Sequence, residues 1–153
     1  MPMTPSDLTH ICLTEACYLP FDQFELFISK LCPRVEMLRI NILDEKNYLD
    51  AERWQCLIVQ HMGHLRTFDF QHRCVIASDD YQYNTYHAII DRFSSPFWLE
   101  HQWYFAHQHS GCSKHRYGRF YSIQPYRYKY HMSPFENDYI CPYRDSGLNM
   151  ARQ

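Results

Sequence analysis

The sequence has few glycines and no segment that would place it in a membrane or direct it out of the cell. Only 4 of its 153 residues are glycine, and no apolar run approaches the length that crosses a bilayer. The N-terminus lacks the basic and then apolar pattern of a secretory signal. The 7 cysteines are an odd number and show no disulfide framework. We therefore expect an intracellular protein, cytoplasmic or nuclear, with no membrane partner.

An excess of positive charge is missing as well. The sequence has 15 Lys and Arg against 17 Asp and Glu, and its formal net charge is -2 with histidine neutral. Because nucleic-acid-binding domains carry a basic surface, we expect no nucleic-acid partner. One stretch argues for the opposite: in residues 126–130 three tyrosines alternate with Arg127 and Lys129, downstream of Arg116 and Arg119. Such a stretch can stack bases, but a strand with tyrosines on its core face and cations in water explains the same alternation.

Aromatic residues, in contrast, are abundant. They make up 17% of the chain, with 13 Tyr and 10 Phe. A chain of this length forms one domain whose core needs no disulfide or metal. Rings in this number fill a core efficiently, and some of them must also lie at the surface or in a groove.

Two segments thirty residues apart share one apolar pattern. Residues 32–40 read C-P-R-V-E-M-L-R-I, and residues 62–70 read M-G-H-L-R-T-F-D-F. A weaker third copy stands 27 residues before the first of these. The corresponding positions are Leu8, Ile11 and Leu13, then Val35, Leu38 and Ile40, then Leu65, Phe68 and Phe70. Recurrence at this period is typical of solenoids, in which one strand-helix unit repeats and neighbouring units bury each other's apolar faces.

Periods of two and of 3.6 residues divide the chain into alternating strands and helices. The predicted strands are residues 8–13, 35–42, 65–70, 97–106, 120–123 and 126–130, and the predicted helices are residues 23–32, 51–61 and 84–93. We expect Asp22 and Asp50 to cap the first two helices, and Gly63 to end the second helix in the left-handed conformation.

A helix followed by a strand of this spacing resembles the leucine-rich repeat. Three stretches, residues 32–40, R-W-x-x-L-I at 53–58 and P-F-W-L-E-x-Q-W at 96–103, together resemble the C-terminal part of eukaryotic F-box proteins with degenerate repeats. The resemblance covers roughly residues 8–131 and implies the substrate-recruiting part of a ubiquitin ligase receptor. The F-box itself is not recognised in the chain, so we expect the ligase adaptor to bind only if an upstream F-box exists.

The predicted fold is therefore α/β: a short leucine-rich-repeat-like solenoid of three to four strand-helix units with parallel strands and an aromatic, β-rich C-terminal cap. Parallel pairing follows because each strand is joined to the next through a helix. We expect the domain at residues 6–131, with the cap from about residue 96, and an irregular tail at residues 132–153.

The predicted function is non-enzymatic protein recognition, without a cofactor, by a protein partner that the sequence does not identify. In a curved array the strands form the concave binding surface. Tyr104 is predicted to face outward from a strand whose Trp103 and Phe105 fill the core. The candidate binding residues are Glu36, Arg39, Asn41, Arg66, Thr67, Asp69 and Tyr104.

The competing prediction is a zinc-binding protein or an enzyme that uses residues 107–115. This segment reads H-x-H-x-x-C-x-x-H, and its candidate ligands are His107, His109, Cys112 and His115. Imidazole and thiolate groups can form a tetrahedral zinc site, but zinc modules usually take two ligands from each of two elements. An exposed polar loop explains the segment more simply, and we assign no catalytic residue. A third alternative is a degenerate gene product that folds poorly because its first strand and helix are uncovered.

Overall fold

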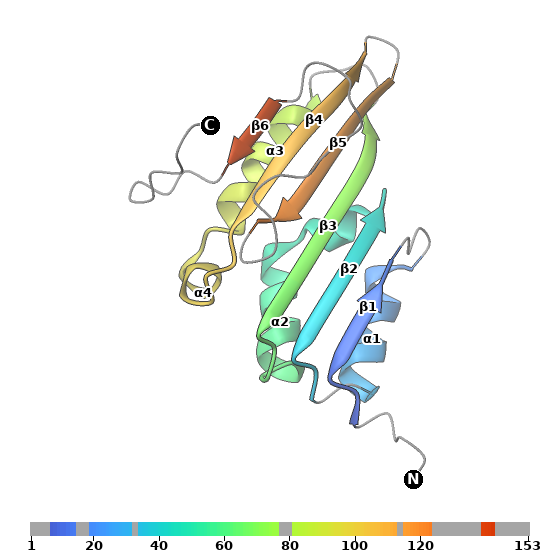
Figure 1. The fold of residues 1–153 in the computed structure, drawn as a ribbon, viewed down its shortest axis with the longest axis vertical. Helices are drawn as coiled ribbons and strands as arrows, with labels where there is room; N and C mark the ends of the chain where they lie inside the picture. Colours follow the sequence, from blue (N-terminus) through green and yellow to red (C-terminus); the bar gives the residue numbers. More distant parts are fainter. Residues whose placement is uncertain are drawn as a thin grey trace.

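The computed structural model describes residues 7–14, 19–31, 34–76, 81–112, 115–123 and 139–142. They form a six-stranded mixed sheet with α1, α2 and α3 behind one of its faces (Figure 1). The strands are β1 (His10–Leu13), β2 (Met37–Leu43), β3 (Thr67–Ile76), β4 (Phe105–Cys112), β5 (His115–Ser122) and β6 (Tyr139–Pro142). The helices are α1 (Phe21–Leu31), α2 (Ala51–His61), α3 (Tyr81–Arg92) and α4 (Pro96–Glu100), with a 3-10 turn, η2, at Lys46–Leu49. None of the described helices is long and apolar enough to span a membrane.

The first three strands are parallel neighbours, as the repeated pattern predicts. The register aligns Ile11 with Leu38 and Phe68, and Leu13 with Ile40 and Phe70. A helix lies between each strand and the next, and such a crossover is what allows consecutive strands to run parallel. Equivalent positions of the three sequence segments are therefore neighbours across one sheet.

The predicted solenoid is wrong, because the sheet does not continue as parallel units. The strand order is β1-β2-β3-β5-β4-β6, and β5 pairs antiparallel with both β3 and β4. β4 ends at Cys112 and β5 begins at His115, so no crossover helix fits between them and the two strands must run in opposite directions. The C-terminal strands extend the same sheet instead of capping a stack. The fold is a small mixed α/β domain.

The segment predicted as a strand at residues 97–106 is instead a short helix followed by the start of β4. Ser95 precedes α4 in an extended conformation, and Pro96 occupies its first turn. Proline is favoured there because the first N–H groups of a helix have no partner within the helix. β4 begins only at Phe105. The strand predicted at residues 120–123 is the end of β5, whereas the one at 126–130 lies outside the described residues.

The predicted helix boundaries were partly right. Asp50 caps α2, since its side chain accepts a hydrogen bond from Arg53 N at 3.0 Å. Asp22 is not a cap, because α1 already begins at Phe21. Gly63 does not adopt the predicted left-handed conformation. α2 ends at His61 and is followed by Met62, whose φ is -126° and whose N–H still donates to Ile58 O, so no left-handed residue is needed there.

The core between the helices and the sheet is built mainly from aromatic rings. Trp54 of α2 contacts Phe68 and Phe70 of β3, with ring centroids 4.9 and 5.5 Å apart. Phe93 contacts Phe105 of β4 at 4.7 Å. All five side chains are buried. Tilted and edge-on pairs of this kind add to the hydrophobic stabilisation from burial.

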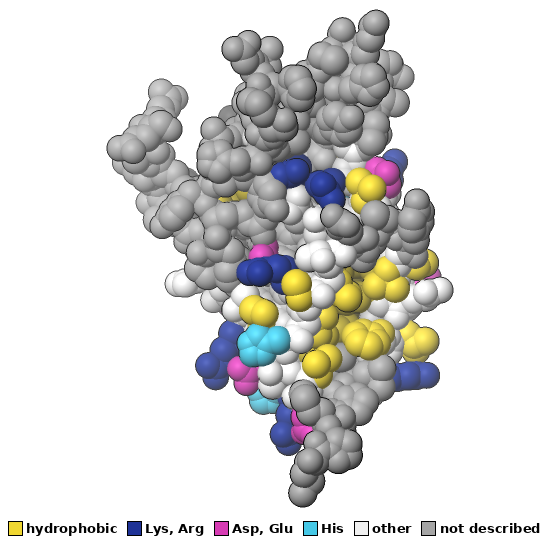
Figure 2. Space-filling model, turned by 45° about the vertical axis from the view of Figure 1, so that its right-hand side comes forward, with side chains coloured by type: hydrophobic (Ala, Val, Ile, Leu, Met, Phe, Trp, Pro, Cys, Tyr) yellow, Lys and Arg dark blue, Asp and Glu magenta, His cyan; other side chains and the backbone are white. Residues whose placement is uncertain are grey.

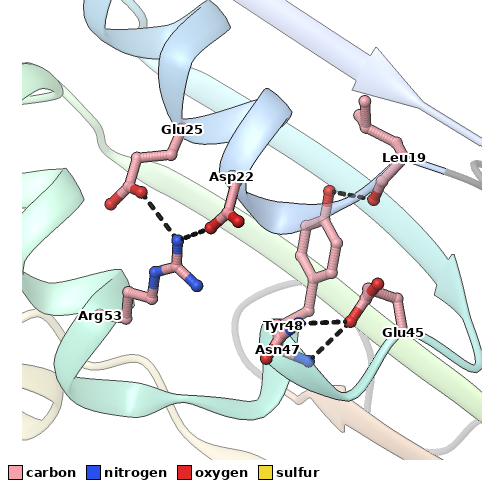
Figure 3. A network of polar contacts seen from close by, with 7 residues as sticks. All are labelled: Leu19, Asp22, Glu25, Glu45, Asn47, Tyr48 and Arg53. Atoms are coloured by element: carbon pink, nitrogen blue, oxygen red, sulfur yellow. Dashed lines mark hydrogen bonds and ion pairs between the residues drawn. The ribbon is translucent and has the colours of Figure 1, made fainter.

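An ionic contact joins α1 to α2 on the outside of this core. Figure 3 shows Arg53 of α2 pointing between Asp22 and Glu25 of α1, and its guanidinium also lies 4.5 Å from the centroid of the Phe21 ring. Deeper in, Tyr48 donates to Leu19 O at 2.9 Å. These contacts fix the two helices against each other. We call the opposite face of the sheet, which none of the described helices covers, the helix-free face (Figure 1).

Candidate functional site

Four of the seven predicted binding residues lie together on the helix-free face of the sheet. Arg39 and Asn41 of β2 alternate with buried apolar residues, and Thr67 and Asp69 of β3 do the same. The parallel register places Arg39 beside Asp69, and Asn41 beside Gln71. Arg39 is exposed, Asn41 and Thr67 are half-buried, and Asp69 is buried. The structure therefore brings these four side chains together on one face of the sheet, although Asp69, which was predicted to face outward, is buried.

An ion pair between Arg39 and Asp69 crosses from β2 to β3. Arg39 Nε donates to Asp69 Oδ2 at 2.8 Å, and the side chains are 51% and 6% exposed. A half-exposed pair of this kind contributes little to stability. Its effect is geometric, because a hydrogen bond at Nε holds the planar guanidinium in place while its outer N–H groups remain accessible to another molecule.

The sequence predicts Glu36 and Arg66 within the strands, but the structure places them just outside. β2 begins at Met37 and β3 at Thr67, so each residue immediately precedes its strand. Arg66 N and Thr67 N both donate to Glu36 O, at 2.8 and 3.0 Å. Both side chains are exposed. They therefore lie at the N-terminal ends of the two strands, where the backbone pairing starts.

Tyr104 is not the exposed anchor that the sequence predicts. It is half-buried and packs against a small cluster of Ala106, Tyr121 and Ile123. Its carbonyl accepts a hydrogen bond from Ile123 N at 2.8 Å. The accompanying prediction was right, because Trp103 and Phe105 are 2% and 1% exposed and belong to the main core.

The helix-free face also carries polar residues that the sequence prediction missed. Gln71 and Arg73 follow Asp69 on β3, and the register pairs Arg73 with Arg119 of β5 and Arg119 with Gln108 of β4. Gln71 and Gln108 are buried, and the two arginines are half-buried. The signal was the alternation of β3, which continues to Ile76 although the predicted strand ended at residue 70.

A second group of polar residues is enclosed between α3 and the sheet. His72 Nε2 lies 3.1 Å from Glu45 O, and His72 Nδ1 lies 3.2 Å from Tyr86 Oη. Tyr86 Oη is in turn 2.6 Å from Cys74 Sγ. A carbonyl oxygen only accepts, so Nε2 carries the proton of a neutral imidazole and Nδ1 accepts from Tyr86. The thiol then donates to the tyrosine oxygen, and every group in the chain has a partner.

Burial keeps this enclosed group uncharged. Burial lowers the pKa of His72 from 6.5 to about 4, despite the hydrogen bond to Glu45 O. Burial likewise raises the pKa values of Cys74 and Tyr86 and lowers that of His109. At neutral pH the cluster therefore has no thiolate to act as a nucleophile and no imidazolium to act as an acid. Its chemistry is that of a structural hydrogen-bond chain.

The candidate metal ligands lie on a β-hairpin and not in an exposed loop. His107 and His109 lie two residues apart on β4, so their side chains share a face of the sheet. His107 Nδ1 lies 3.1 Å from His109 Nε2, and His107 is fully buried. Cys112 and His115 are register partners at the ends of β4 and β5, and their side chains lie outside the described residues. In the part of the chain that is described, no group of three or more His, Cys, Asp or Glu is placed to hold a metal. The structure thus brings two of the four candidates together.

We compared the chain with models of protein families, with curated proteins and with solved structures. No family model, no curated protein and no solved structure matches it. The site geometry and the sequence patterns are therefore the basis for a functional conclusion.

Proposed function

We propose that the protein recognises another protein, without catalysis, through the helix-free face of its sheet around β2 and β3. The observation that carries this proposal is the ion pair of exposed Arg39 with buried Asp69, on the face of the sheet opposite α1, α2 and α3 (Figure 1). Asn41 and Thr67 lie on either side of the pair along the strands and are accessible in part.

The ion pair supports recognition because it orders a long side chain before any partner arrives. Immobilising a flexible side chain on binding costs roughly 0.5–1.5 kcal/mol. Asp69 holds Arg39 through a single nitrogen, so most of its donors remain available to a partner at a reduced entropic cost. Arginine is also enriched among the residues that dominate interface energies.

The charge of the face indicates what kind of partner surface fits it. Among the described residues of the sheet, this face carries Arg39, Arg73 and Arg119 but a single carboxylate, Asp69. We therefore expect the recognised surface to be acidic, with carboxylates that accept from guanidinium groups. The neutral His72 cluster on the other face gives no comparable support to an enzymatic function.

The finer form of the proposal is substrate recognition for a ubiquitin ligase. It depends on the resemblance of residues 32–40, 53–58 and 96–103 to F-box proteins. In this form the recognised protein would be the ligase substrate, and the ligase adaptor would bind only through an F-box joined to this domain. Direct titration of this chain with purified adaptor should show no binding, and binding would contradict that form of the proposal.

A comparison of two matched variants tests the recognition face. Proteins retained by the immobilised chain from an extract of its source cells are quantified for wild type, Arg39→Gln and Arg92→Gln, and a retained protein is then purified and titrated. Arg92 is an exposed arginine in the last turn of α3, so its variant makes the same charge change away from the face. We expect Arg39→Gln to weaken binding about tenfold or more and Arg92→Gln to leave it unchanged. Equal binding by the two variants, or no retained protein, would contradict the proposal.

A further inference from the structure

The edge strand β1 carries none of the charged or proline residues that normally prevent pairing with another strand. β1 is the first strand in the sheet order, and among the described strands its partner is β2. Its residues read H-I-C-L, with no Lys, Arg, Asp, Glu or Pro. Edge strands of soluble proteins usually carry such residues because their unpaired N–H and C=O groups are a template for another strand.

Exposed apolar side chains lie beside this strand. Leu26 and Phe27 of α1 are 53% and 39% exposed, and α1 lies behind β1 at the same edge of the molecule (Figure 1). In Figure 2, which turns this side forward, hydrophobic side chains gather over it. On β1 itself Cys12 is exposed and Leu13 is half-buried. We call the surface of β1 with Leu26 and Phe27 the β1–α1 edge.

We propose that the β1–α1 edge is a homodimer interface, in which β1 pairs antiparallel with β1 of a second copy. A two-fold axis perpendicular to the sheet produces this pairing and keeps the helices of both copies on the same side. The same operation brings the two α1 helices together, antiparallel. The outer backbone groups of β1 and the exposed Phe27 of α1 are then covered in one step.

The charges of this surface are compatible with a second copy of itself. Two registers, centred on Ile11 or on Cys12, keep the pleats aligned. In either of them the cross-strand pairs join residues of H-I-C-L with each other or with the flanking Thr9 or Thr14, none of which is acidic, lysine or arginine. On α1, Asp22 and Glu25 are turned toward α2, where they contact Arg53. Gln23, Phe27 and Lys30 form the stripe at helical spacing on the opposite side.

Antiparallel packing of this stripe places Lys30 opposite Gln23 of the partner subunit, with Phe27 near the axis. No pair of like charges is brought together, so the interface has no electrostatic cost to overcome. A partner that offered only a strand would leave Phe27 in water. The second copy covers both parts of the edge, which is why we favour it.

Sedimentation equilibrium over a range of concentrations tests the proposal. We expect the mass of the wild-type chain to rise from 18.7 kDa toward twice that value as its concentration is raised. Because no ion pair is involved, added salt should not dissociate the dimer. Cys12→Lys on the strand and Phe27→Lys on the helix should each keep the chain monomeric, because both place a charge in the interface.

Val59→Lys is the matched control, because Val59 is 63% exposed and lies on α2, outside the β1–α1 edge. This variant should dimerise as the wild type does, and circular dichroism should show the same secondary structure for all three variants. A wild-type chain that stays monomeric up to about 1 mM overturns the proposal. So does a dimer that persists in both Cys12→Lys and Phe27→Lys. Neither result affects the recognition face, which is tested by Arg39→Gln.

Discussion

Asp69 and His72 are polar side chains enclosed on opposite faces of β3. Asp69 is 5% exposed and accepts from Arg39, whereas His72 is 1% exposed and lies in a chain of neutral hydrogen bonds. Burying a polar group is costly unless its hydrogen bonds are restored, and both residues meet this condition in different ways. One keeps an accessible charged partner, and the other loses its charge altogether.

The low pKa of His72 makes stability depend on pH. The unfolded chain binds a proton at this residue near pH 6.5, but the folded chain does so only near pH 4. The contribution of neutral His72 to the free energy of unfolding is therefore fully present above pH 6.5. It is lost as the pH drops toward 4, where the loss reaches about 3 kcal/mol. Urea denaturation of wild type and His72→Gln between pH 7 and 4 measures this contribution.

The variant should be less stable at pH 7 and should lose less stability on acidification than the wild type does. His64→Gln provides the comparison, because His64 is an exposed histidine between α2 and β3. It makes the same substitution at a histidine outside the buried cluster. If His72→Gln showed the same loss as wild type between pH 6.5 and 4, the buried neutral histidine would not be the cause.

At the scale of the element, the start of α2 depends on one side chain. Asp50 accepts from Arg53 N at 3.0 Å and so satisfies one of the N–H groups that the helix cannot pair internally. Asp50→Ala should lower the free energy of unfolding by about 1 kcal/mol. Asp50→Asn retains a capping oxygen and should lose only a few tenths of that. Urea denaturation at pH 7 distinguishes the two variants, and equal losses would argue against capping.

Elements with a clean period were predictable from the sequence. β1, β2 and the start of β3 alternate between apolar and polar residues, and the helix at Ala51–His61 was predicted with the bounds it has. Each of these segments has one face in the core, so its local pattern and its tertiary packing agree.

Elements without such a period were not predictable. Residues 97–100 are rich in aromatic residues, which favours a strand locally, yet Pro96 at the first turn and burial of Trp98 make them helical. β3 extends beyond residue 70 because β5 supplies a second set of hydrogen bonds from Gln71 onward. The length of β3 therefore depends on pairing with β5, which the local sequence of β3 does not indicate.

At the scale of the whole molecule, the connections between strands determined the outcome. The parallel register of β1, β2 and β3 follows from two helical crossovers, and the short connection between β4 and β5 reverses the direction. A repeat in the sequence therefore indicated neighbouring strands correctly but did not indicate how the sheet continues. The predicted solenoid extended the pattern of β1, β2 and β3 to later segments of the chain, where the strands pair antiparallel.

The candidate site was predictable to the same extent as the sheet. Arg39, Asn41, Thr67 and Asp69 share a face because their strands alternate in register. Tyr104 was misjudged because the side chains that bury it, Tyr121 and Ile123, come from β5 and from the residue after it. Residues whose surroundings are supplied by distant strands need the three-dimensional arrangement before their exposure is known.

The most direct test of protein recognition by the helix-free face is to map a bound partner on the molecule. Side-chain NMR signals of the chain are recorded during titration with the protein that it retains. We expect shifts to concentrate at Met37, Asn41 and Thr67, on the helix-free face, while the signals of Val59 on α2 are unchanged. Shifts confined to α1, α2 and α3, with Asn41 and Thr67 unaffected, would contradict it.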